Sequence, residues 1–129
     1  MINEELVKRM SESGFIKHNN ISIVEIGKDS AILKAELTEN SLNPYKIAHG
    51  GLIFGLGDTS MGVVARIEGR SAVTQSSTIS YLRPATGSYL IAKAEMIKNG
   101  NTTCYLRTNI YDEKDNLVAT MDGNYFYID

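Results

Sequence analysis

The chain has 129 residues, of which 43% are hydrophobic and 22% charged. These values are typical of one soluble globular domain and argue against disorder. The formal net charge is −2, so there is no basic excess to bind the phosphate backbone of a nucleic acid. We expect a single domain over residues 1–129 with no nucleic-acid partner.

Cysteine and histidine usage indicates a reducing compartment and no metal site. Cys104 is the only cysteine and His18 and His49 are the only histidines, too few for a disulfide or a cysteine- or histidine-based metal site. Acidic residues precede any apolar run at the N-terminus, unlike a signal peptide, and no segment has the roughly 20 apolar residues that cross a bilayer. We expect a cytoplasmic protein with no membrane partner.

The first predicted element is a short amphipathic helix over residues 3–13. Its apolar residues recur at helical spacing and charged residues occupy the other positions. Gly14 follows, where such a helix would end. The apolar stripe consists of Leu6, Val7 and Met10.

Two strands are predicted within residues 20–37, with a turn at residues 27–30. Apolar and polar residues alternate over residues 31–37, which is the period-two pattern of a half-buried strand. An irregular segment over residues 38–49 follows.

A second helix is predicted from Gly50 to Arg66. Asp58 is the only ionisable residue between His49 and Arg66, and a helix that is apolar on nearly every side is normally buried. Four strands are predicted after it, and strands joined by short turns are antiparallel. The predicted fold is α+β, with one long antiparallel sheet wrapped around this central helix and a short N-terminal helix. The four strands lie near residues 71–82, 90–96, 104–110 and 117–128.

Glycines crowd the central helix, although each interior glycine costs about 1 kcal/mol relative to alanine. Gly51, Gly55 and Gly62 fall near one helical stripe. Close approach of another backbone or of a ligand would offset the cost. Tight packing against a second element explains Gly55 and Gly62 as readily as a ligand does.

Two features of this helix carry potential chemistry. Gly50 and Gly51 stand at its start, where N–H groups without helical partners favour an anion or an oxyanion. Asp58 lies too deep to cap the helix, and its helical neighbours carry no charge. Such a carboxylate suits a general base or a nucleophile. The alternative is a structural hydrogen bond to a serine, threonine or backbone group of the sheet.

The spacing of these features predicts a dimer. Asp58 lies eight residues after Gly50, about 12 Å along a helix axis. One carbonyl cannot touch both, so two chains must supply them if both serve one substrate. Two antiparallel helices in a homodimer would create two equivalent sites.

The loop before the helix contains two further candidates. His49 precedes the glycines and is more commonly a structural hydrogen-bonding residue than a catalyst in such a place. Asn43 precedes Pro44, and this pair marks a turn, although the amide could also hold a water or a carbonyl.

The run Asn43 to Asp58, NPYKIAHGGLIFGLGD, resembles the hotdog-fold acyl-CoA thioesterases. It resembles most the phenylacetic-acid-degradation subgroup, which is related to the 4-hydroxybenzoyl-CoA thioesterases. The resemblance rests on His-Gly-Gly, the acid eight residues after the first glycine, the asparagine six before the histidine, and the later segment Tyr81–Pro84. It covers nearly the whole chain, because the predicted strand order matches as well.

This resemblance implies a fold, an assembly and a reaction. The sheet would wrap the helix, and two chains would join into a dimer, commonly into a tetramer made of two dimers. The reaction would be hydrolysis of an acyl-CoA thioester, which needs no metal or redox cofactor. The Gly50 or Gly51 amide would polarise the carbonyl, and Asp58 of the other chain would be nucleophile or general base. Asn43 would position the water or the carbonyl, and His49 would shape the loop.

Relatives also place a serine or threonine near the acid, on the strand after the helix. Thr74 and Ser76 both qualify here, and Thr74 is preferred because it lies seven residues before Tyr81. Arg83 and Lys98 are candidates for the phosphates of CoA. An apolar pocket would accept aryl or medium alkyl groups, and its candidate lining residues are Tyr45, Ile47, Phe54 and Met61.

Two alternatives remain open at this stage. The first is an (R)-specific enoyl-CoA hydratase of the same fold, which has similar Asn-Pro and Ala-His-Gly segments. Such hydratases use an Asp and a His before the helix. Here no Asp lies between Glu39 and His49, which disfavours this alternative. A non-catalytic acyl-CoA-binding protein usually adds a DNA-binding segment, for which too few residues precede the first strand. The intact Asp58 also disfavours a binding protein.

Overall fold

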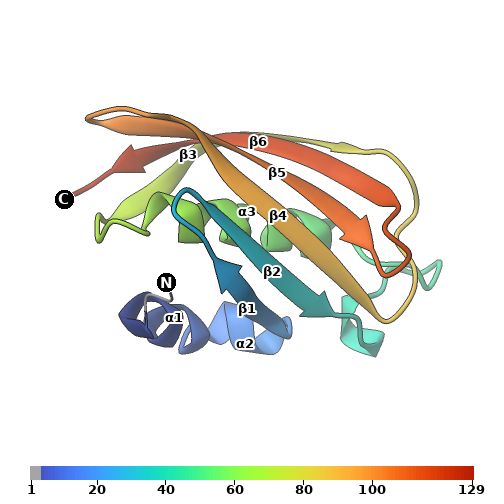
Figure 1. The fold of residues 1–129 in the computed structure, drawn as a ribbon. Helices are drawn as coiled ribbons and strands as arrows, with labels where there is room; N and C mark the ends of the chain where they lie inside the picture. Colours follow the sequence, from blue (N-terminus) through green and yellow to red (C-terminus); the bar gives the residue numbers. More distant parts are fainter. Residues whose placement is uncertain (1–3) are drawn as a thin grey trace.

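Helix α3 (Gly50–Ala65) lies along the concave side of one curved six-stranded sheet (Figure 1). The computed structural model describes residues 4–129. All five strand pairs are antiparallel, in the spatial order β1-β2-β4-β5-β6-β3. This architecture confirms the predicted fold class. The other elements are α1 (Glu4–Ser11), α2 (Gly14–His18), β1 (Ile21–Ile26), β2 (Ser30–Glu36), a 3-10 turn (Glu39–Ser41), β3 (Ala72–Tyr81), β4 (Tyr89–Asn99), β5 (Thr103–Asp112) and β6 (Leu117–Tyr127).

The core forms between the sheet and one side of α3. Alternate residues along the strands point toward the helix, as the period of two requires. Leu56 of α3 is fully buried among them. The fully buried sheet side chains include Leu33, Leu90, Leu106, Ile110 and Val118.

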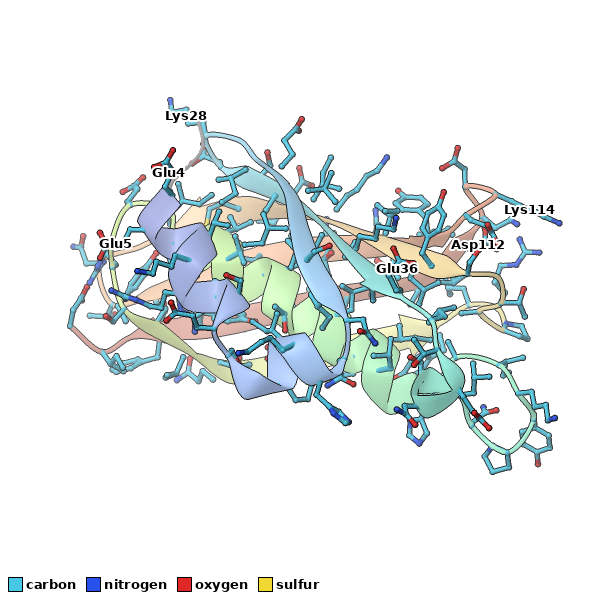
Figure 2. The ribbon with its side chains drawn as sticks, turned by 90° about the horizontal axis from the view of Figure 1, so that it is seen from below. Glu4, Glu5, Lys28, Glu36, Asp112 and Lys114 are labelled. Carbon is cyan, nitrogen blue, oxygen red and sulfur yellow. The ribbon has the colours of Figure 1, made fainter. Side chains whose placement is uncertain are left out.

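The other side of α3 is only partly covered. Figure 2 shows α1 and α2 lying across this side, with Glu4 and Glu5 of α1 at the periphery. Phe15 of α2 packs so closely that a Cβ added to Gly55 would lie 2.8 Å from its ring. The structure therefore explains Gly55 by tight packing of a second element.

Two predicted elements end elsewhere than expected. The N-terminal helix ends at Ser11, and Gly14 begins a second short helix, because Ser13 is extended (φ −65°, ψ 129°) and turns the chain so that Ile16 is buried. Asn3 lies outside the described residues. The strand predicted to end near Met96 continues to Asn99, past an irregularity in its pairing with β5. A 3-10 turn occupies part of the segment predicted to be irregular.

His49 caps the start of α3. Its backbone is extended (φ −64°, ψ 136°), and its Nδ1 accepts a hydrogen bond from the Gly51 N–H at 2.8 Å. A helix start leaves several N–H groups without helical acceptors, and this contact satisfies one of them. The Gly50 N–H has no hydrogen-bond partner among residues 4–129. No helix in that range is long and apolar enough to span a membrane.

The His49 cap generates a stability prediction. Replacing His49 with alanine leaves the Gly51 N–H without its acceptor and should lower the free energy of unfolding by about 1 kcal/mol. Asparagine caps helices well, so His49→Asn should restore most of the loss. The free energy of unfolding of each variant is measured by urea unfolding, monitored by circular dichroism.

The other histidine provides a matched control. His18 is exposed, and His18→Ala should change the free energy of unfolding by no more than about 0.5 kcal/mol. Equal losses in the two alanine variants would contradict the capping role of His49.

Candidate active site

Asp58 is held by two hydroxyl groups from the sheet. Its Oδ1 accepts hydrogen bonds from Thr74 Oγ1 of β3 at 2.7 Å and from the Tyr125 hydroxyl of β6 at 2.5 Å. The same hydroxyl lies 2.6 Å from the Asp58 backbone carbonyl oxygen, so these two oxygens share its one proton. Asp58 Oδ2 accepts no hydrogen bond from residues 4–129. One carboxylate oxygen is therefore fixed in place while the other remains available to a reactant.

Asp58 is half-buried, not fully buried as the apolar helix predicted. Its carboxylate contacts Thr74 and Tyr125 of the sheet and lines a pocket together with Met10 of α1 and Ile16 of α2, so Asp58 keeps part of its exposure. The structural hydrogen bond considered for this residue is present, since Thr74 supplies a threonine hydroxyl. That bond occupies only Oδ1, so it does not prevent chemistry at Oδ2.

Tyr125 was not predicted as a site residue. Its side chain is 1% exposed, and burial, followed by the negative charge of Asp58, raises the pKa of its phenol far above the ordinary value. The phenol therefore stays protonated and donates to Asp58. In the sequence it is one inward position of the last strand, and nothing distinguishes it there from an ordinary core aromatic residue.

A bulge in β3 determines which hydroxyl reaches Asp58. The pairing of β3 with β6 shifts between Thr74 and Ser76, so one extra residue lies between them and the side-chain alternation is interrupted. Thr74 contacts Asp58, whereas the Ser76 hydroxyl accepts a hydrogen bond from Asn124 at 3.3 Å. The structure thus places Thr74, and not Ser76, beside the acid.

A pocket of about 420 Å³ opens beside Asp58, Thr74 and Tyr125. Its walls come from α1, the second half of α3 and the start of β3, and three arginines line it: Arg9, Arg66 and Arg70. None of these arginines was predicted as a site residue.

The three arginines differ in their partners. Arg9 pairs with Glu5 at 3.4 Å, and Arg70 pairs with Asp129 at 3.0 Å. Arg66 donates a hydrogen bond to the Ala72 carbonyl at 2.7 Å and has no carboxylate within ion-pair distance among the described residues. Arg66 is therefore the cation most available to an anionic ligand of this pocket.

The start of α3 forms a separate part of the candidate site. The Tyr81 hydroxyl donates to the Gly50 carbonyl at 2.8 Å, so the end of β3 lies beside the helix start. Asn43 Oδ1 accepts from the Tyr45 N–H at 2.9 Å and from the Ile47 N–H at 3.4 Å. The side-chain amide oxygen of Asn43 therefore stabilises its own loop, as the turn interpretation predicts.

The remaining predicted ligand-binding residues are dispersed within one chain. Tyr45 is 84% exposed and does not line the Asp58 pocket, and Phe54 is partly buried against the core. Arg83 lies in the connection that leads into β4 and Lys98 near the end of β4, and these two ends of β4 lie at opposite ends of the sheet (Figure 1). No three His, Cys, Asp or Glu side chains within residues 4–129 gather closely enough to hold a metal ion.

Comparison with known proteins identifies the family. The model of the thioesterase superfamily matches residues 45–119, which is more than half of the chain. The chain is 26% identical to the Escherichia coli PaaI protein from the phenylacetic acid degradation operon, with a TM-score of 0.92 over 98% of this chain and 93% of that one. It is 31% identical to smu.793 from Streptococcus mutans bound to acetyl CoA, with a TM-score of 0.79 over 84% and 88% of the two chains.

A third relative has been solved as two single-residue variants. It is a hypothetical thioesterase from Streptococcus pneumoniae, 28% identical with a TM-score of 0.80, and the match covers 84% of this chain and at least 90% of that one. In one variant an aspartate is replaced with alanine, and in the other a threonine is replaced with alanine. The two altered positions are 16 residues apart. The same distance in sequence separates Asp58 from Thr74. From the family match and these likenesses, the chain belongs to the thioesterase superfamily.

Proposed function

We propose that the protein hydrolyses acyl-CoA thioesters to a free acid and CoA, at a site that two protomers of a homodimer build together. The observation that carries the proposal is the Asp58 carboxylate, with Oδ1 held by two hydroxyls and Oδ2 free beside a 420 Å³ pocket. Two relatives support it: smu.793 binds acetyl CoA, and the S. pneumoniae protein was altered at an aspartate and a threonine with matching spacing.

Asp58 supplies the base or the nucleophile of the reaction. As a base, Oδ2 takes a proton from water while the water oxygen attacks the thioester carbonyl. As a nucleophile, Oδ2 attacks the carbonyl itself and water then hydrolyses the mixed anhydride. In both routes the carbon–sulfur bond breaks and the CoA sulfur leaves with the electron pair and takes up a proton. Thr74 and Tyr125 orient the carboxylate through Oδ1.

The Gly50 N–H polarises the carbonyl in this proposal. It lies at the positive end of the α3 dipole and has no partner among residues 4–129, which suits it to an oxyanion. The Gly51 N–H already donates to His49. Between the two glycine amides considered from the sequence, the proposal therefore assigns the role to Gly50.

Two protomers are needed because the helix separates its two functional ends. Gly50 and Asp58 lie about 12 Å apart along the axis. Strand β3 is an edge strand, is mostly exposed, and runs beside α3 with Thr74 at Asp58 and Tyr81 at Gly50. If two β3 edges pair antiparallel with the centre between Ser77 and Thr78, Thr74 of one chain lies opposite Tyr81 of the other. Because Thr74 contacts Asp58 and Tyr81 contacts Gly50, this pairing would bring the partner's Gly50 to Asp58.

The arginines favour a CoA ester over a simpler thioester. Arg9, Arg66 and Arg70 line the Asp58 pocket, and guanidinium groups suit the phosphates of CoA. We assign the main phosphate contact to Arg66, because it has no carboxylate partner among the described residues. Arg83 and Lys98 remain candidates at the two ends of the sheet.

Replacing Asp58 with asparagine tests the acid. Asp58→Asn keeps the shape and removes the basic oxygen, and kcat should fall about 10³-fold on the best ester of a panel of acetyl-, hexanoyl-, dodecanoyl- and benzoyl-CoA. The rate of thiol release from each ester gives kcat. Asp122→Asn, a half-buried aspartate of β6, is the control and should keep wild-type turnover.

The same panel separates the competing functions. Thiol release that persists in Asp58→Asn would contradict the mechanism. Hydration of crotonyl-CoA that survives Asp58→Asn would favour the hydratase. Binding of acyl-CoA without turnover of any ester would favour a binding protein.

Mixing two inactive variants tests the shared site. Gly50→Pro removes the N–H and adds a ring at a position where the helix tolerates proline, because Gly50 is the first helical residue and His49 is already extended. A heterodimer of Gly50→Pro and Asp58→Asn, co-expressed with two tags and purified through both, contains one intact and one doubly altered site. This heterodimer should recover about half of the wild-type turnover per dimer, because a symmetric dimer has two equivalent sites and one of them is intact.

Gly50→Ala is the matched control for the proline variant. Both variants place a Cβ at 3.3 Å from the Tyr81 hydroxyl, but alanine keeps the N–H. Gly50→Ala should therefore be far more active than Gly50→Pro. A heterodimer no more active than its two parent homodimers would overturn the shared site.

A further inference from the structure

A second cavity lies next to the Asp58 pocket, lined by residues of α1, α2, β1 and β2 and by Thr59 of α3. Its volume is about 180 Å³. Apolar side chains form most of its wall, and no ionisable residue lines it. The apolar lining side chains are Val7, Met10, Ile16, Ile21, Ile23 and Leu33.

The two cavities share a wall. Met10, Ile16 and Thr59 line both of them, and Thr59 directly follows Asp58 in α3. The small cavity therefore adjoins the Asp58 pocket at Thr59, Met10 and Ile16.

The cavities differ sharply in character. The pocket beside Asp58 carries Arg9, Arg66 and Arg70, whereas the small cavity is lined by no charged group. Apolar groups gain from transfer out of water, while charged groups lose hydration there. The apolar part of a substrate thus belongs in the small cavity and its anionic part in the larger pocket.

The volume limits what can enter. A cavity of about 150 Å³ lined by aliphatic and aromatic side chains is large enough to bind benzene, and 180 Å³ is only slightly larger. We infer that the small cavity is the acyl subsite, and that the substrates are CoA esters of uncharged acids with one ring or a chain of about six carbons. This inference rests on the proposed function.

Helix α1 determines the acyl preference in this arrangement. Val7 and Met10 are half-buried on its inner side and close the cavity over α3. Val7 lines the small cavity but not the Asp58 pocket, so a change at Val7 alters acyl binding without a direct contact to the acid.

Filling the cavity tests the inference. Val7→Phe places a ring in the space assigned to the acyl group. The ratio of kcat/KM for hexanoyl-CoA to that for acetyl-CoA should fall 10- to 100-fold, the range that pocket contacts with a few methylenes provide. The ratio for benzoyl-CoA should fall likewise. Wild-type preference for hexanoyl- and benzoyl-CoA over succinyl-CoA, which carries a charge, is also expected.

Val24→Phe is the matched control. Val24 lies on β1, is 56% exposed and lines none of the cavities described here, so the same substitution there should leave the ratio within twofold of wild type. An unchanged ratio in Val7→Phe, or an equal fall in Val24→Phe, would overturn the acyl subsite.

Binding measurements separate this inference from the proposed function. If wild type cleaves none of the esters, hydrolysis is wrong, and calorimetry then compares hexanoyl-CoA with CoA. Tighter binding of hexanoyl-CoA that is lost in Val7→Phe would still support the subsite. Equal affinity for the two ligands would overturn it.

Discussion

The structure depends on one packing constraint: a single sheet can cover only one side of the apolar helix α3. The sheet buries Leu56 and its neighbours on that side. The opposite side is left to the two short helices α1 and α2 (Figure 2), and Gly55, Asp58 and Thr59 of α3 are only half-buried. The open space that remains there forms both cavities, so the candidate site is a direct consequence of how α3 is packed.

The Asp58 carboxylate is tolerated on that side because the sheet supplies its partners. Thr74 and Tyr125 come from the neighbouring strands β3 and β6, and both donate to the same oxygen. Burial keeps Tyr125 in its protonated, donating form. The hydroxyls offset part of the cost of withdrawing a charge from water and orient the oxygen that stays free, which is the preorganisation that the proposed hydrolysis requires.

The edge position of β3 links the site to assembly. Its backbone groups on the outer side are open to pairing with another chain, and the same strand provides Thr74 beside Asp58 and Tyr81 beside Gly50. A second copy added at this edge would extend the sheet and complete the site in one step. In the proposed function two chains are needed because of the length of the helix, since one carbonyl cannot reach both Gly50 and Asp58 of the same α3.

Local patterns in the sequence determined the sheet, the central helix, its start at Gly50 and the candidate acid, because periodicity and spacing are properties of neighbouring residues. Tertiary structure alone decided the rest. The bulge that selects Thr74 over Ser76, the meeting of Tyr125 with Asp58 across 67 positions and the gathering of Arg9, Arg66 and Arg70 all depend on strand register and on the packing of α1. No local pattern encodes these contacts, since each joins segments that only the folded chain brings together.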